Sequence, residues 1–119
     1  MEPIDLETAL ASFTEHFSPR VLAALNGQHV KVAKLKGAFP WHAHADADEL
    51  FFVLSGSFVL AFRDREVTVD TGQMIVVPAG VEHRPVAEHE CAVLLFEPAG
   101  TLNTGDAPES ELTTPGESL

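Results

Sequence analysis

Apolar positions occur in short groups along the chain, and their spacing predicts one short helix followed by many short strands. Within residues 4–16 the apolar side chains recur at helical spacing, and Asp5 is placed to cap the first turn. Pro19 follows soon afterwards and should stop the helix. We therefore expect a helical segment within residues 1–18, outside the main β-domain.

The rest of the chain has the spacing of an all-β protein. Asn26 and Gly27 form a strong two-residue hairpin signal, and residues 29–36 alternate between polar and apolar with a slip near Ala33. Further short apolar runs, separated by Gly, Pro and charged turns, predict strands over 50–54, 57–62, 67–69, 74–77 and 91–96. Strands this short and this often interrupted indicate a sandwich or a barrel, which we place over residues 19–104.

The strand predicted over residues 50–54 is apolar on both faces. Side chains alternate between the faces of a strand, so Leu50, Phe52 and Leu54 point to one side and the two residues between them to the other. One face can line a barrel interior. The other needs a cover, which can be a helix, a second sheet or a second subunit. We expect a homodimer.

Composition and charge narrow the classes of partner. A chain of 119 residues with 45% hydrophobic content fits one globular domain. Its net charge of −11 repels phosphate backbones and anionic lipid headgroups, so we expect neither a nucleic-acid nor a membrane partner. Acidic residues stand where a signal peptide carries basic ones, and the single cysteine, Cys91, suits a reducing compartment. These features predict a cytoplasmic protein.

The end of the chain differs in composition from the β-rich part. Residues 105–119 combine acids, Pro, Ser and Thr with only two leucines, so they have little apolar surface to bury. We expect a flexible acidic tail there. The segment over residues 99–106 could close over the barrel mouth or leave it, and the sequence does not decide between the two.

Candidate metal ligands are concentrated in the stretch "WHAHADADELF", residues 41–51. His42 and His44 are two residues apart, so both imidazoles point to the same side of an extended chain. Glu49 begins the next apolar strand, where a buried carboxylate needs a partner such as a divalent cation. The competing interpretation is a solvated loop that is rich in His and Asp. A further histidine, His83, follows the turn "PAG" in a second stretch.

These two stretches resemble the two sequence motifs of the cupin superfamily. The first motif is matched by Gly37, His42, His44, Glu49 and Gly56, and the second by Gly72, Pro78, Gly80 and His83. Two details depart from the usual pattern. Only four residues separate Gly37 from His42, one fewer than usual, and Ala87 stands where an asparagine often ends the second motif. Neither departure falls on a ligand position.

The resemblance to small single-domain cupins implies an antiparallel β-barrel of the jelly-roll type with one metal inside. The implied ligands are His42, His44, Glu49 and His83. Three imidazoles and a carboxylate suit Fe, Mn, Ni, Cu, Co or Zn without choosing among them. The resemblance implies a metal-dependent enzyme of dioxygenase or isomerase type acting on a small chelating molecule. The alternative is a non-catalytic cupin that binds or senses a small ligand and keeps a structural metal.

The other polar residues near these motifs support weaker hypotheses. Asp46 or Asp48 could orient a ligand histidine, and Arg63 or Arg84 could anchor an anionic ligand. Cys91 begins an apolar strand and is expected in the core. The chain has no tyrosine, which excludes a phenol as acid or base, and the sequence identifies no catalytic residue beyond the metal ligands.

Overall fold

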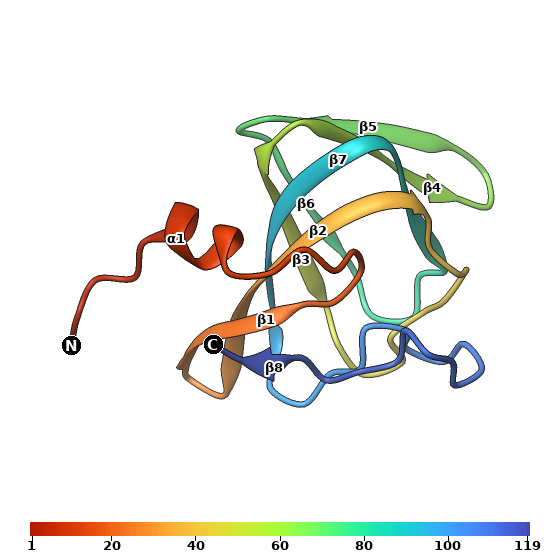
Figure 1. Cartoon of the computed structure of the whole chain (residues 1–119). Coiled ribbons are helices and arrows are strands. Elements are labelled where there is room, and N and C mark those ends of the chain that lie inside the picture. Colours follow the sequence, from red (N-terminus) through yellow and green to blue (C-terminus); the bar gives the residue numbers. More distant parts are fainter.

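The computed structural model describes residues 1–119 and consists of one short helix and eight strands. The helix α1 spans Leu6–Ala11. The strands are β1 (Arg20–Leu25), β2 (Gln28–Ala38), β3 (Glu49–Ser55), β4 (Ser57–Phe62), β5 (Glu66–Asp70), β6 (Met74–Val77), β7 (His83–Pro98) and β8 (Glu117–Ser118). Helix α1 and the N-terminus lie outside the strands, which curl around a common interior (Figure 1).

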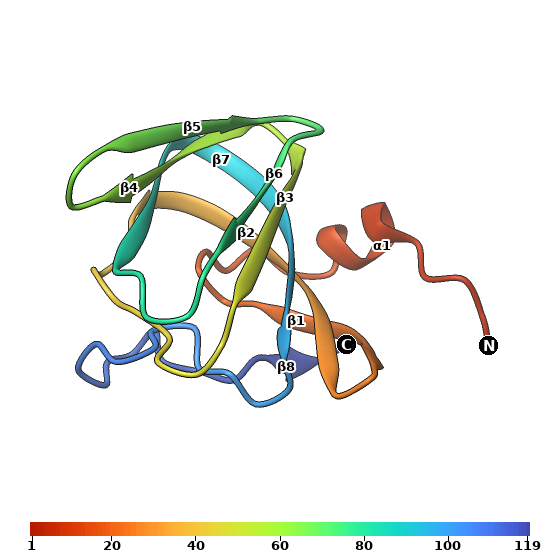
Figure 2. The same ribbon diagram turned by 180° about the vertical axis from the view of Figure 1, so that it is seen from behind.

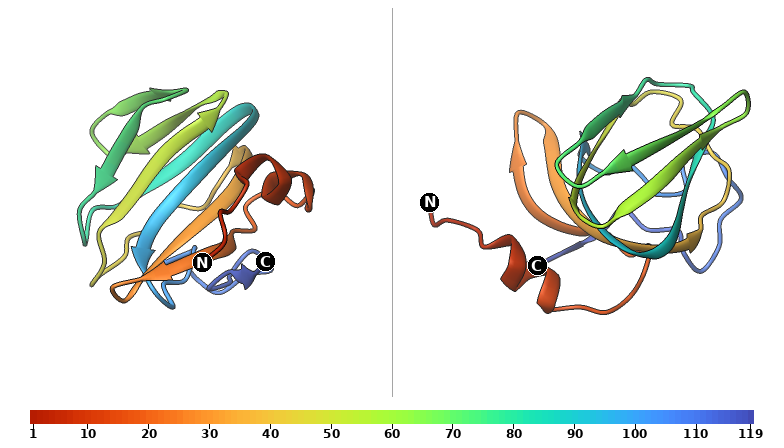
Figure 3. Two further views of the ribbon diagram at one scale, coloured as in Figure 1. Left: turned by 90° about the vertical axis from the view of Figure 1, so that its left-hand side faces the viewer. Right: turned by 90° about the horizontal axis from the view of Figure 1, so that it is seen from above.

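The long strand β7 organises the sheet because it has partners on both sides. It pairs antiparallel with β2 along most of its length, with β4 over its first residues and with β3 over its last ones. Strand β5 extends the sheet beyond β4, β6 lies beside β3, and β1 and β8 continue it beyond β2. Figure 2 shows β3 and β6 from behind, and the view from above in Figure 3 shows how the strands wrap around the interior.

The predicted helix is real but shorter than residues 4–16. Asp5 caps it as expected, since its Oδ1 accepts a hydrogen bond of 3.1 Å from the Thr8 backbone N–H. The helix ends at Ala11 because the chain then turns to bury Phe13. The ring of Phe13 lies under the side chains of Arg20 and Lys34, which tie this segment to the sheet.

The hairpin signal at Asn26 and Gly27 is confirmed. Both residues have positive φ, 51° and 77°, as a tight turn between β1 and β2 requires. The alternation along β2 does slip near Ala33, because Lys31, Val32 and Ala33 are buried in succession. The pairing of β2 with β7 shifts further along, between Leu35 and Gly37. At that point the single residue between them lies opposite three residues of β7.

Strand β7 begins at His83, earlier than the strand predicted over residues 91–96. The acidic and polar segment around His89 lies inside β7. It lies at the shift in the pairing with β2, where Glu88, His89 and Glu90 are all exposed. A polar sequence is compatible with a strand here because neither face is covered.

The segment over residues 105–119 was expected to be a flexible tail, but the structure gives it several contacts with the sheet. Its last residues form β8, which runs parallel to β1. The Glu117 carboxylate accepts a hydrogen bond of 2.6 Å from the buried Arg20 side chain. Composition predicted little apolar burial, and the contacts that are present are indeed mostly hydrogen bonds and charges.

The interior is filled by twelve buried residues from six of the strands, and Cys91 is one of them. The cysteine is fully buried, and burial raises the pKa of its thiol to about 11. No helix of the structure is both long and apolar enough to cross a membrane.

Because a buried, protonated thiol reacts slowly, native protein at pH 8 should be almost inert to a thiol-specific dye such as dithionitrobenzoate. The same protein in urea should release about one equivalent of colour, since the chain has a single cysteine. Rapid labelling of the folded protein would contradict the packed position of Cys91.

Candidate metal centre

The two motif stretches are joined by backbone hydrogen bonds. The N–H of His42 donates to the carbonyl of His83 at 3.0 Å, and the N–H of His83 donates back to the carbonyl of His42 at 2.9 Å. The carbonyl of His44 accepts a further hydrogen bond from Gly80. This ladder places residues that are about 40 positions apart in the sequence side by side.

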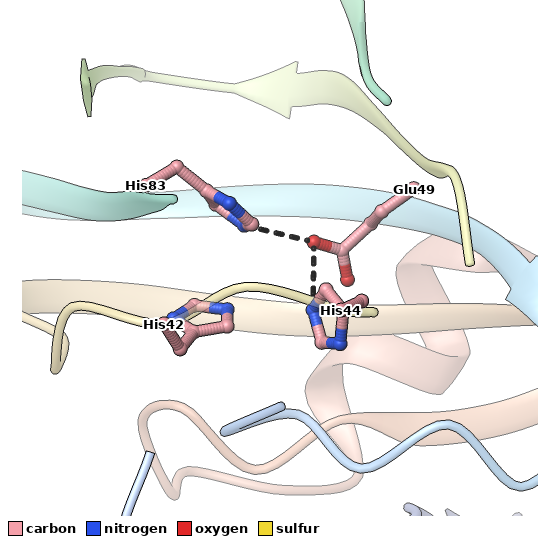
Figure 4. A group of neighbouring side chains, drawn as sticks. All are labelled: His42, His44, Glu49 and His83. Carbon is pink, nitrogen blue, oxygen red and sulfur yellow. Dashed lines mark ion pairs between the residues drawn. The ribbon is translucent and has the colours of Figure 1, made fainter. Parts of the chain in front are cut away.

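The four predicted ligands come together inside the curved sheet. His42, His44, Glu49 and His83 are all buried, and their ligand atoms lie within 4.8 Å of one another. Glu49 Oε1 is 3.5 Å from His44 Nε2 and 3.4 Å from His83 Nε2 (Figure 4). Two ligands bound to one ion at about 2.1 Å each can be no more than about 4.2 Å apart, so only a small contraction is needed.

Backbone carbonyls orient two of the imidazoles. His42 Nδ1 lies 2.9 Å from the Pro40 carbonyl, and His83 Nδ1 lies 2.8 Å from the Val81 carbonyl. A carbonyl can only accept, so Nδ1 carries the proton in both rings and the lone pair of Nε2 is free. That is the tautomer in which Nε2 can bind a metal.

The protonation states also suit a metal. Burial, together with the neighbouring His83 and His44 imidazoles, lowers the pKa of His42 to about 4. His42 is therefore neutral at pH 7 and can act as a ligand. Burial by itself would raise the pKa of Glu49, but its contacts with His44 and His83 hold that pKa well below the ordinary value.

Three ligand atoms of the cluster lack a hydrogen-bond partner. His44 Nε2, Glu49 Oε1 and His83 Nε2 are buried and have no hydrogen-bond partner. Buried polar atoms are rarely left in this state, because each one costs roughly 1–3 kcal/mol. All three atoms converge on one point, where a single cation would satisfy them together. The residues present therefore fit a divalent transition metal.

A small apolar pocket adjoins the cluster. His42 and Glu49 form part of its wall, and most of the rest is apolar, including Phe17, Phe39 and Phe51. Its volume is about 40 Å³, enough for roughly three water molecules. A small molecule in this pocket could therefore approach a metal held by the cluster.

The segment after β7 holds the ligand-bearing stretch in place. The Ala43 N–H donates to Asp106 Oδ1 at 2.7 Å, and the Asp106 N–H donates to the Ala43 carbonyl at 2.9 Å. Gly105 lies so close that a Cβ built on it would be 2.3 Å from the Ala43 oxygen and 3.1 Å from His44 Nδ1. Residues 99–106 thus pack beside the site, and Asn103 lines the pocket.

Several weaker hypotheses are not supported. Asp48 accepts a hydrogen bond from the Ala79 N–H and so fixes the turn before His83, but it does not contact a ligand imidazole. Arg63 is exposed, stacks on Trp41 and pairs with Glu82, outside the pocket.

Three residues beside the site escaped the sequence analysis: Lys31, Glu97 and Asp106. Lys31 and Glu97 are fully buried and paired at 2.9 Å, and the Glu97 carboxyl also contacts Glu49. Burial and the Glu49 carboxylate raise the pKa of Glu97 to about 8. The available signal was their spacing, since Lys31 is in step with the apolar Ala33 and Leu35, and Glu97 is in step with the apolar Val93 and Leu95.

Comparisons with known proteins agree with this geometry. The chain is 36% identical over 64 residues to "Uncharacterized protein YdbB" of Bacillus subtilis, covering 53% of this chain and 57% of that protein. It is 41% identical over 69 residues to Germin-like protein 1 of Brassica napus, covering 50% and 33%. The chain thus spans little more than half the length of the first relative and a third of the second.

Solved structures match most of the chain. A cupin-2 domain containing protein from Shewanella frigidimarina is 44% identical, with a TM-score of 0.79, and the match covers 80% of this chain and 93% of that one. Protein NMB1881 from Neisseria meningitidis is 34% identical, with a TM-score of 0.75, and the match covers 82% and 99%.

These neighbours confirm the predicted cupin fold with a short N-terminal helix. The family model described as "Cupin domain" matches residues 28–97, which is more than half of the chain and includes all four clustered side chains. The chain belongs to the cupin family.

Proposed function

We propose that this cupin is a metal-dependent enzyme that acts on a small chelating molecule, with His42, His44, Glu49 and His83 as the metal ligands. The observation that carries the proposal is the convergence of three buried, unpartnered ligand atoms on one point. A transition metal bound there would supply Lewis-acid polarisation or, for a redox-active ion, oxygen chemistry of the dioxygenase type. Isomerisation is the other reaction class that such a site supports.

The chain's own residues would orient the metal ligands and select the substrate. The carbonyls of Pro40 and Val81 hold two imidazoles in the tautomer that leaves Nε2 free. The aromatic walls of the pocket leave room for few water molecules and favour a substrate with a flat, apolar body. The pocket is small, so the substrate would bind mainly through a chelating end that reaches the metal.

A second candidate is a cupin that binds or senses a small ligand without turnover. The polar side chains of the pocket wall are few, namely His42, Glu49 and Asn103, and the first two are proposed metal ligands. Asn103 has its amide committed to backbone groups. The pocket therefore offers little for proton transfer, which favours binding over acid–base chemistry.

An experiment with cobalt distinguishes the enzyme and the ligand-binding cupin, which both need an open coordination position, from a protein whose metal site is closed and structural. Protein loaded with Co²⁺ should change its visible spectrum when azide or catechol is added, because an open coordination position accepts an outside ligand. No change with either probe would favour a structural metal. With iron loaded instead, oxygen consumption in the presence of catechol-type chelators would favour the enzyme over the binding module.

We also propose a homodimer formed through the outer face of β3, β6 and β7. Cross-strand neighbours form two apolar rows on this face, Val76–Leu50–Phe96–Val30 and Met74–Phe52–Leu94–Val32. Met74 and Val76 are 65% and 53% exposed, and the other residues of the rows are half-buried, apart from the buried Val32. A continuous apolar sheet face of this kind is suited to a self-complementary interface.

Light scattering coupled to size exclusion should give a mass about twice the 12.8 kDa of one chain. Val76→Glu should shift the protein to monomer, because it places a charge in the interface without touching the interior. Thr68→Glu, an exposed position on β5, is the matched control and should leave the dimer intact. A monomeric wild type at micromolar concentration would refute the assembly.

A further inference from the structure

A buried ion pair lies inside the sheet next to the metal cluster. Lys31 on β2 and Glu97 on β7 are 0% and 1% exposed, and Lys31 Nζ donates to Glu97 Oε1 at 2.9 Å. Lys31 also donates to the Thr101 carbonyl at 3.3 Å. Burying two charges is costly unless each of them finds all its partners, so such a pair calls for an explanation.

The partners of this pair are incomplete. Lys31 satisfies only one oxygen of Glu97, and the other oxygen, Oε2, is buried without a hydrogen-bond partner. An ion pair kept only for stability would be expected to satisfy both oxygens. The second oxygen of Glu97 therefore has to be explained by what lies on the other side of the carboxyl group.

Strand register places Glu49 on that other side. In the pairing of β3 with β7, Phe51 is opposite Leu95 and Leu50 is opposite Phe96, so Glu49 and Glu97 come next on the two strands. Both point inward, and their carboxyl groups are in contact. Two carboxyl groups side by side in a poorly polarisable interior repel each other when both are ionised, and a cation on each side relieves that repulsion.

The arrangement supplies one of these cations and implies the other. Lys31 stands beside Glu97, and the point at which the unpartnered atoms of Glu49, His44 and His83 converge stands beside Glu49. The order along this line is thus ammonium, carboxyl, carboxylate and metal position. An alternation of charge of this kind orients the ligand carboxylate and favours a cation at its free end.

We propose that Glu97, anchored by Lys31, is a positioning residue that holds the Glu49 carboxylate toward the metal and thereby raises the affinity of the site. This role rests on the proposed metal site. Glu97 does not line the pocket, so it acts through Glu49 and not on the substrate. The role predicts effects on metal affinity and on metal spectra that a pair serving only stability would not produce.

The test is the binding of Co²⁺ to Glu97→Gln, which keeps the shape of the side chain and replaces its carboxyl group with an amide. We expect the affinity to fall by about 10- to 100-fold, with an altered visible spectrum at saturating cobalt. Because Glu97→Gln leaves Lys31 without its carboxyl partner and could unfold the chain, Lys31→Met/Glu97→Leu is the second variant. It removes both charges together and is expected to fold and to show the same loss.

Glu117→Gln is the control, because it also removes a carboxylate that pairs with a buried cation, Arg20, but is exposed in strand β8 and is not part of the cluster. Its cobalt affinity should stay within about twofold of the wild type. Wild-type affinity and spectrum in both interior variants would overturn the positioning role alone. A wild-type protein that takes up no cobalt would overturn the metal site and this role with it.

Discussion

Protein purified without added metal or chelator is expected to contain about one equivalent of a divalent transition metal, whereas the His42→Ala/His83→Ala variant should contain almost none. The two substitutions remove half of the proposed ligands, and these two imidazoles are the ones already held in the metal-binding tautomer. Elemental analysis measures the difference directly. Metal should also raise the melting temperature of the wild type and not that of the variant, because a ligand that binds only the folded state stabilises it.

The control is the removal of two histidines outside the cluster. His16 pairs with Glu90 at the surface, and His89 is exposed on β7. His16→Ala/His89→Ala should keep the metal content of the wild type. Equal metal in all three proteins would mean adventitious binding. The comparison matters most when the metal found is zinc, since strong nitrogen and oxygen sites acquire zinc readily.

Gly105→Ala should weaken metal binding by about 10-fold or more, although residue 105 is not a ligand. The added methyl group would stand 2.3 Å from the Ala43 carbonyl oxygen, so either the Gly105 segment or the stretch between His42 and His44 must move. Movement of either breaks the two hydrogen bonds between Ala43 and Asp106. Unfolding in urea should also show a loss of about 1–3 kcal/mol, as is usual for overpacking.

Gly100→Ala separates the clash from the cost of the backbone conformation. Gly100 also has a positive φ, 83°, but a Cβ there would meet nothing within 4 Å. This variant should lose a modest amount of stability through the left-handed conformation and keep the metal affinity of the wild type. If both alanine variants bound metal equally well, the packing of residues 99–106 would have no part in shaping the site.

The elements that short-range signals define were predicted best. The turn at Asn26 and Gly27, the cap at Asp5 and the strand over residues 74–77 depend on neighbours within a few positions, and the structure has all three. The errors concern element boundaries that are set by contacts with residues far away in the sequence. The helix ends early because Phe13 packs against the sheet, and β7 continues through a polar stretch because β2 pairs with Ala87 and Cys91 on either side of it.

The end of the chain illustrates the same limit. Its composition predicts a segment with little to bury, and no local pattern marks it as part of the fold. Asp106 nevertheless accepts a hydrogen bond from the Ala43 backbone, and Glu117 accepts one from the Arg20 side chain. Such contacts join positions about 60 and 100 residues apart, and no periodicity reports a pairing at that range.

The four clustered side chains could be named from the order and spacing of the motif residues alone. Spacing succeeds because His42 and His44 share one side of a short extended stretch, while glycine and proline turns set where Glu49 and His83 begin their strands. The partners of these side chains could not be named in that way. The contact of Lys31 and Glu97 with Glu49 follows from the register of β2, β7 and β3, and register is settled only when the whole sheet packs its interior.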